Sequence, residues 1–309
     1  MAPPLPYSVL LIRLVGRTIL PFLALIFCGL FLLPKHLLKP TGTLLPYKEE
    51  DRRVKRYRKC ILDSARGEVW HNLDKIIDGC KRNYSKIRPD SFFELHMGRY
   101  KEKKFFLPIR KRPERCIWLT IGIGGDILVE QEMKKKYPEC EIFGVEPGTE
   151  DQYAGFEKFG TVIPLGIGLE PGNLTMRVRV GTKYKFREVG IHPLAEVLDS
   201  YIGSRRIHFA TLDIEGFEYP LVTALEKDNQ FDREGVTFCQ VDVEFHSQDM
   251  KVAFGRKKHF RFSTFFRSFL RNSPYLPVTH AKFLSHNKAT FINTADPLCG
   301  NMFEFDSYF

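Results

Sequence analysis

Apolar and polar positions alternate along the chain in a pattern that predicts strands and helices following one another from residue 116 onward. Short apolar runs bounded by glycine, proline or acidic residues indicate buried strands. These runs lie at residues 116–121, 141–145, 161–166, 207–212 and 236–245. The segments between them carry apolar residues at helical spacing and predict helices at residues 127–136, 151–159, 194–201 and 219–227. Such alternation indicates an α/β protein with a mostly parallel sheet and helices on both of its faces.

Further elements are predicted on either side of this alternation. Phenylalanines at 262, 265, 266 and 269 follow helical spacing, and Pro274 follows the end of that helix. Residues 277–284 and 289–293 have the pattern of a closing hairpin, and residues 174–180 that of another hairpin strand. A packed helix is expected at residues 68–80, and residues 100–115 are expected to form a basic loop or sheet edge.

The N-terminal region contains an apolar segment of a different kind. Residues 18–33 are 16 uncharged, mainly apolar residues, and Arg17, which precedes them, can extend its charged end to the headgroups. No Ala-X-Ala-like cleavage site follows. We therefore expect one N-terminal transmembrane helix, a signal anchor at residues 18–34, after a short tail at residues 1–17.

This anchor divides the rest of the chain into three predicted parts. Residues 35–66 are interpreted as a stem or basic juxtamembrane segment, in which residues 49–64 form a solvated helix or stalk. Residues 67–115 are interpreted as an N-terminal helical extension. Residues 116–309 are expected to form the main domain.

The cysteines bear on the compartment. Six lie beyond the apolar segment, and an even number suits an oxidising lumen, as do the sequons at Asn83 and Asn173. Cys116, Cys140 and Cys239 nevertheless stand in apolar, strand-like contexts that are typical of buried free thiols. Basic residues flank the apolar segment on both sides, so charge alone does not orient it. We expect a single-pass membrane protein of the Golgi or endoplasmic reticulum with a lumenal domain.

The net charge of +10 is unevenly distributed, and this changes its meaning. Residues 117–250 hold 13 Lys or Arg against 23 Asp or Glu, whereas residues 35–59 hold 9 against 3. The predicted sheet is therefore acidic and the flanking segment basic. An acidic core argues against a nucleic-acid partner.

Glycines and a carboxylate follow the first two predicted strands. Gly122, Gly124 and Gly125 form a turn that ends in Asp126, where the backbone can approach a ligand closely. Glu146 ends the next strand, 22 residues after Gly124. An acidic residue at about this distance suits the two hydroxyl groups of a ribose. The pair of features indicates an adenosine-containing ligand.

Acidic residues and a histidine follow two later strands. Asp213 is expected to point into the cleft at the carboxyl end of its strand, with Glu215 at the rim. Glu218 is interpreted as a charge at the N-terminus of the following helix. His246 ends the fifth strand and is a candidate general base.

Taken in order, four segments of this region are similar to one known family. They are WLTIGIGGD, GVEP, VIPLGIG and TLDIEGFEYPLV, and they resemble the FkbM-type S-adenosylmethionine-dependent O-methyltransferases over residues 116–293. The resemblance implies a Rossmann-like, seven-stranded sheet, S-adenosylmethionine as cofactor and a hydroxyl acceptor, often on a glycan. It implies that Gly122, Gly124 and Glu146 bind the cofactor and that Asp213 and Glu215 line the site.

The sequence departs from that family at the glycine turn. Members usually carry an acidic residue two positions before the first glycine, where this chain has Thr120, and the usual glycine run is altered to Gly124, Gly125 and Asp126. Gly125 belongs to the predicted cofactor turn, and Asp126 is a candidate to supply part of the missing acidic contact.

The chemistry requires an acceptor oxygen held in line with the methyl group and relieved of its proton. Asp213 and His246 are the candidate bases, with Glu215 orienting the acceptor. No His/Cys cluster has zinc spacing, so no metal is expected, although a divalent ion between Asp213 and Asp242 is compatible with the sequence.

Two other function classes remain open at this point. A lumenal glycosyltransferase would use an acidic pair, Asp213 with Glu215 or Asp242 with Glu244, to bind a metal ion. A membrane-anchored binding module without catalytic activity would use the basic, aromatic residues 251–271 as a contact surface.

Overall fold

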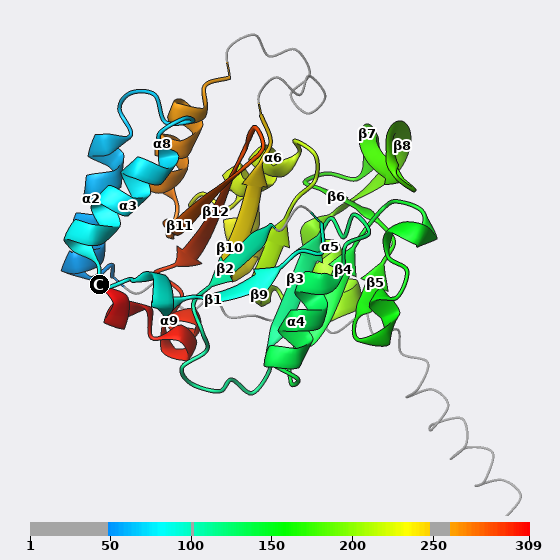
Figure 1. Ribbon diagram of the computed structural model, residues 1–309, viewed down its shortest axis with the longest axis horizontal. Coiled ribbons are helices and arrows are strands. Elements are labelled where there is room, and N and C mark those ends of the chain that lie inside the picture. Colours follow the sequence, from blue (N-terminus) through cyan, green and yellow to red (C-terminus); the bar gives the residue numbers. More distant parts are fainter. Residues whose placement is uncertain (1–48, 100–101, 248–259) are drawn as a thin grey trace, which may run out of the picture. The chain divides into compact units, whose positions relative to one another are not determined.

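A seven-stranded sheet organises the protein, in a computed structural model that describes residues 49–99, 102–247 and 260–309 (Figure 1). Its strand order is β11-β12-β10-β9-β3-β4-β5. Neighbouring strands from β10 to β5 run parallel, whereas β12 is antiparallel to both β10 and β11. The mixed α/β architecture with a mostly parallel sheet fits the predicted Rossmann-like fold. The sheet strands are β3 (Ile117–Ile121), β4 (Glu141–Val145), β5 (Thr161–Ile163), β9 (Arg206–Leu212), β10 (Thr237–Phe245), β11 (Tyr275–Phe283) and β12 (His286–Asn293).

Two smaller sheets accompany it. One pairs β1 (Phe93–His96) with β2 (Lys103–Phe106), and β2 lies against β10 and β12. The other has the order β6-β8-β7, from Gly166–Gly168, Lys183–Pro193 and Gly172–Val180. The helices are α2 (Arg52–Ser64), α3 (Leu73–Tyr84), α4 (Leu128–Lys136), α5 (Leu194–Val197), α6 (Glu218–Ala224), α7 (Gln230–Glu234), α8 (Phe262–Asn272) and α9 (Pro297–Phe303).

The helix predicted at residues 151–159 does not form as an α-helix. The segment forms two short 3-10 turns, Glu150–Gln152 and Phe156–Lys158, because Gly155 between them adopts a φ of +86°. The strand predicted at residues 161–166 ends at Ile163, and β6 belongs to a separate sheet. The hairpin strand β7 was predicted, but its partner β8 was not. The exposed half of β8 carries no apolar alternation that marks one buried face.

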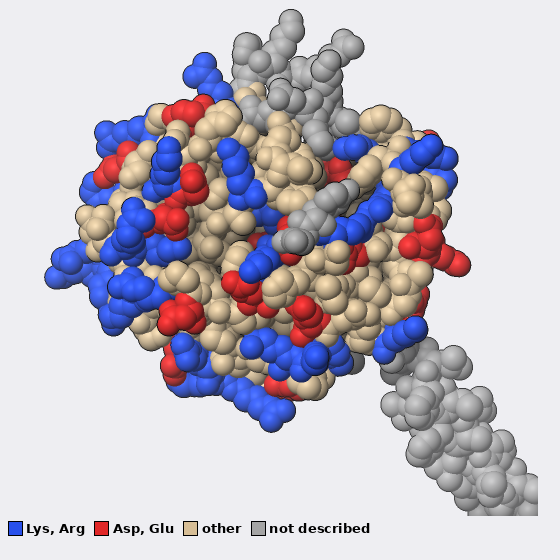
Figure 2. Space-filling view, in the orientation of Figure 1, with Lys and Arg blue, Asp and Glu red and all other residues tan. Residues whose placement is uncertain are grey.

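The segment before residue 67 is not a solvated stalk where the structure describes it. Helix α2 buries Val54, Tyr57 and Ile61, and the Tyr57 hydroxyl donates a hydrogen bond to the Pro277 carbonyl at 2.7 Å. It packs beside α3 and α8 (Figure 1). Its charged residues other than Arg58 are exposed, and Lys and Arg side chains gather on that side of the molecule in Figure 2. The helix is amphipathic, but six of its thirteen residues are basic, and they mask its short apolar stripe in the sequence.

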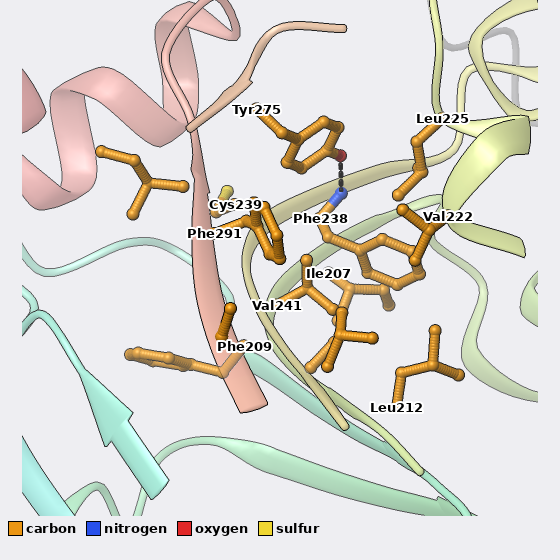
Figure 3. Close-up of a cluster of buried hydrophobic side chains, with 14 of the residues drawn as sticks. Ile207, Phe209, Leu212, Val222, Leu225, Phe238, Cys239, Val241, Tyr275 and Phe291 are labelled. Carbon is orange, nitrogen blue, oxygen red and sulfur yellow. Dashed lines mark hydrogen bonds between the residues drawn. The ribbon is translucent and has the colours of Figure 1, made fainter. Parts of the chain in front are cut away.

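The centre of the sheet is packed with aromatic and branched side chains (Figure 3). Phe209 and Phe291 are completely buried, and the Tyr275 hydroxyl accepts the Phe238 backbone N–H at 3.0 Å. Successive side chains of β9 and β10 point to opposite faces of the sheet, and nearly all of them are buried. Both faces of these strands are therefore covered, as is usual for parallel strands between helices. This packing fixes the register on which the strand ends depend.

Three disulfides join cysteines that lie far apart in the sequence. Cys60 pairs with Cys80, Cys116 with Cys140 and Cys239 with Cys299. The expectation of free thiols at Cys116, Cys140 and Cys239 is therefore wrong. Apolar context is compatible with a buried thiol and with a buried disulfide alike, and only the fold brings each pair together.

No helix in the part of the chain that the structure describes is long and apolar enough to cross a membrane. The predicted anchor at residues 18–34, with the tail before it, lies outside the described residues.

The disulfide between Cys116 and Cys140 closes a loop of 24 residues just before β3 and β4. A loop of this length is worth about 3 kcal/mol of stability, mainly through the unfolded chain. We predict that the double substitution Cys116→Ser with Cys140→Ser lowers the free energy of unfolding by about this amount. Urea unfolding under non-reducing conditions measures it, and peptide mapping of the unreduced protein should recover all three cross-linked pairs. Equal stability of the variant and the wild type in oxidising buffer would contradict the bridge.

Candidate functional site

The strands β4, β3, β9 and β10 end in register at one edge of the sheet. Val145 lies opposite Ile121, Ile121 opposite Leu212, and Leu212 opposite Val243. The chain order along the sheet reverses between β3 and β9, which is where ligands bind in open parallel sheets. A cavity of about 320 Å³ lies here, and Gly122, Glu146, Asp213 and Glu244, the residues that follow this row, all line it.

The glycine turn after β3 is required by a close backbone approach. Gly122, Gly124 and Gly125 have φ values of +94°, +59° and +77°, which favour glycine. A Cβ atom at Gly122 would lie 1.9 Å from the Asp213 carbonyl oxygen. The Asp213 N–H donates to the Ile121 carbonyl at 3.0 Å, so the loops after β3 and β9 are joined directly.

Glu146 lies across this turn. Its two carboxylate oxygens accept the N–H groups of Gly124 and Gly148, each at 2.8 Å, and the residue is 6% exposed. Burial raises the pKa of Glu146, and these two hydrogen bonds oppose the rise. Each oxygen keeps a second lone pair for a ligand, so the carboxylate can accept two hydroxyl groups.

Asp126 is held from the opposite side of the turn. Its carboxylate accepts the backbone N–H of Gly98 at 3.1 Å and of Arg99 at 2.8 Å, and the Arg99 guanidinium lies 3.4 Å away. Asp126 lines the cavity, but these partners occupy both oxygens and its charge is paired. It anchors the loop between β1 and β2 onto the glycine turn.

Asp213, Glu215 and His246, the predicted catalytic residues, meet at the same place. His246 Nε2 lies 3.7 Å from Asp213 Oδ1 and 3.8 Å from Glu215 Oε2. Glu244 Oε1 follows at 3.9 Å. Glu215 adopts a positive φ of 57°, which is uncommon outside glycine and turns its side chain back toward the cavity.

Glu218 orients His246, a role that the sequence did not indicate. It is completely buried, and one oxygen accepts the N–H groups of Ile214 at 2.9 Å and Gly216 at 3.1 Å. The same oxygen lies 2.8 Å from His246 Nδ1, which must donate because a carboxylate only accepts. Glu218 is the first residue of α6, as predicted, but its carboxylate binds the loop before the helix and the histidine.

The environment of His246 favours its charged form. Burial acts against the imidazolium, but the hydrogen bond to Glu218 and the charges of Glu218, Asp213 and Glu244 outweigh it and raise the pKa of His246 to about 10. Nearby, burial and the charge of Asp213 raise the pKa of Glu215 and bring that of Glu244 to about 9. At neutral pH His246 therefore holds a proton on both ring nitrogens.

The residues proposed above as metal ligands are only partly available. Asp242 is bound on one oxygen by Lys104 Nζ at 3.2 Å and on the other by the Thr290 hydroxyl at 3.0 Å, so it does not face Asp213 as a ligand. Two other groups have atoms close enough to share an ion, namely Glu244 with His246 and His286, and Asp213 with Glu218 and His246. An ion bound through Nε2 of His246 would have to replace the proton there.

Several residues at the cavity escaped sequence analysis because they come from distant elements. From the β7–β8 hairpin, Arg177 lies 3.2 Å from Glu215 and 4.2 Å from the ring centre of Tyr184. From β2 comes the buried Lys104. Two lining residues, Glu102 and Glu244, are in turn close to the buried Lys288 of β12, which contacts Glu102 and lies 3.5 Å from Glu244. Charged or polar residues within predicted buried strands are the sequence feature that could have identified them.

Comparison with known proteins agrees with this geometry. The sequence model of the methyltransferase FkbM domain matches residues 101–275, which is more than half of the chain, while the search of curated proteins finds no significant match. The matched region contains the glycine turn, Glu146, Asp213 and His246. Nothing comparable supports the glycosyltransferase alternative. The chain belongs to the FkbM methyltransferase family and is an S-adenosylmethionine-dependent methyltransferase.

Proposed function

We propose that the protein binds S-adenosylmethionine between the glycine turn and Glu146 and methylates a hydroxyl group of a glycan or other small acceptor. One observation carries this proposal. Asp213, Glu215 and His246 converge at the end of the same cavity that Glu146 and the glycine turn line, so cofactor and acceptor sites adjoin.

The residues present fit the adenosine part of the cofactor. Glu146 offers two free lone pairs to a ribose, and the three glycines of the turn, Gly122, Gly124 and Gly125, carry no side chains that would obstruct an approaching ligand. When bound, S-adenosylmethionine supplies a methyl group activated on a sulfonium. The protein therefore needs only to place the acceptor oxygen and to accept its proton.

Asp213 is the residue that we propose as the base. His246 is protonated at neutral pH and cannot accept a second proton, whereas the Asp213 side chain is 29% exposed toward the cavity. The imidazolium stands between Asp213 and Glu215 and offsets their mutual repulsion. Glu215, held by Arg177, is left to orient the acceptor hydroxyl.

The β7–β8 hairpin supports a sugar as the acceptor. Tyr184 lines the cavity and Phe186 lies two residues further along β8, and they are 44% and 61% exposed. Exposed aromatic rings provide flat apolar faces, here the ring of Phe186 and the face of Tyr184 that Arg177 does not cover, and a tyrosine adds a polar edge. A sugar ring has apolar C–H faces and hydroxyl edges, so it matches this combination.

The disulfides support a lumenal location, which we propose together with the N-terminal anchor. Bridges of this kind persist in oxidising compartments such as the endoplasmic reticulum and the secretory pathway. Asn83 and Asn173, the asparagines of the two sequons, are both exposed and so accessible to glycosylation.

We predict that Glu146→Ala weakens binding of S-adenosylmethionine by about tenfold or more. Charge-assisted hydrogen bonds to two hydroxyl groups are lost, each worth roughly 1.5–3 kcal/mol. Isothermal titration calorimetry on the full chain measures the change. Glu150→Ala removes an exposed carboxylate four residues away and serves as the control. Wild-type affinity in Glu146→Ala would place the ribose elsewhere.

We predict that Asp213→Asn lowers methyl transfer by about 10²–10⁴-fold while cofactor binding survives. The amide keeps the shape of the carboxylate but cannot accept the proton. Transfer of labelled methyl to a mixed glycan pool measures activity, with His246→Gln assayed in parallel. Full activity of Asp213→Asn beside an inactive His246→Gln would assign the base to His246. No activity in the wild type would favour a binding module.

The raised pKa of His246 also predicts how stability depends on pH. The folded state binds the proton more tightly than the unfolded state, whose histidine has an ordinary pKa of 6.5. This contribution is fully present below pH 6.5 and is lost as the pH rises to about 10. Urea unfolding of the wild type and of His246→Gln should therefore show a stability difference that shrinks between these pH values. A difference that stays constant or grows would mean that His246 is neutral in the folded protein.

A further inference from the structure

A second buried carboxylate lines the cavity and has no role in the site described so far. Glu130, in the first turn of α4, is 3% exposed. Its Oε1 accepts the hydroxyl of Thr120, from the centre of β3, at 2.5 Å. Its Oε2 has no hydrogen-bond partner among residues 49–99, 102–247 and 260–309. Both Glu130 and Thr120 belong to the cavity wall.

A buried carboxylate with only one of its two oxygens hydrogen-bonded lowers the stability of the folded protein. Burial raises the pKa of Glu130 to about 7, so near neutral pH the group is divided between a desolvated anion and a neutral acid. The described residues offer it no ion pair. Lys104 attracts it, but its ammonium group is 3.2 Å from Asp242 instead. A cationic group entering the cavity would satisfy both the charge and the free oxygen.

The location of Glu130 indicates which ligand would carry such a cation. Thr120 lies opposite Gly144 on β4, and Glu146 follows two residues later, directly after the end of that strand. The Thr120–Glu130 pair and Glu146 are thus both within reach of the turn at Gly122 and line one cavity. A ligand that fills this cavity can place its hydroxyl groups against the carboxylate of Glu146 and a cationic group against the carboxylate of Glu130.

We propose that Glu130, positioned by Thr120, binds the α-ammonium group of the cofactor's amino-acid portion. This inference rests on the proposed cofactor site. In this proposal Glu130, and not Asp126, supplies the acidic contact that Thr120 cannot make. Backbone amides and Arg99 already engage both oxygens of Asp126. The cation completes the hydrogen bonding of Oε2 and makes a charge-assisted bond.

The test compares two ligands that differ only at this end. S-adenosylhomocysteine carries the amino-acid portion, and 5′-methylthioadenosine lacks it. Calorimetry on the full chain should show that Glu130→Gln binds S-adenosylhomocysteine about 10- to 100-fold more weakly than the wild type does. Its affinity for 5′-methylthioadenosine should change by less than about twofold, because the adenosine contacts remain.

Glu132→Gln is the matched control on the same helix, since the carboxylate of Glu132 instead accepts the His96 N–H at 2.7 Å. It should leave both affinities unchanged. Thermal unfolding shows whether Glu130→Gln folds; the substitution keeps the shape and removes a buried charge, so its melting temperature should not fall. An equal loss of both ligands, or no loss of either, would overturn the role of Glu130. A wild type that binds neither ligand would instead refute the proposed cofactor site itself.

Discussion

The site depends on the contact between Gly122 and the backbone of Asp213. At this point the loops after β3 and β9 approach so closely that no side chain fits between them. The approach is possible because the two strands are neighbours in the sheet, although residues 122–205, which include β4, β5 and the smaller sheet of β6, β7 and β8, separate them along the chain. The residues that we propose for the cofactor, on one side of the crossing, and those that we propose for the acceptor, on the other, are thereby brought to one cavity. Any side chain at Gly122 would separate them.

Buried charge is the main cost of this arrangement, and backbone amides offset much of it. Glu146 and Glu218 each accept two backbone N–H groups and Asp126 accepts three, and such groups stabilise a carboxylate without mobile side chains. His246 then supplies a positive charge to Asp213 and Glu215, whose own amide contacts are fewer. The result is a preorganised site in which the proton on His246 is part of the structure.

The sequence predicted those features that local pattern determines. The five parallel strands, the glycine turn, and the positions of Glu146, Asp213 and His246 at strand ends follow from apolar runs and from what interrupts them. It did not predict contacts between residues that are distant in the sequence and meet only in the folded chain. The Glu218–His246 and Thr120–Glu130 hydrogen bonds join different elements, and the three disulfides do the same. Strand β8 is half exposed and was not predicted, because it shows no clear alternation of apolar residues. The helix α2 was expected, but its many basic residues concealed that one of its faces is buried.

The charges around the cavity also bear on turnover. Seven acidic side chains line it; the pKa of one of them, Glu244, is raised to about 9, and four Lys or Arg side chains and the protonated His246 offset most of the charge of the others. In the proposed reaction, methyl transfer converts a cationic sulfonium into a neutral thioether, and the acceptor proton goes to Asp213 and removes one negative charge from the wall. Both changes remove an attraction between opposite charges. The proposed base would therefore serve the release of the spent cofactor as well as the chemical step.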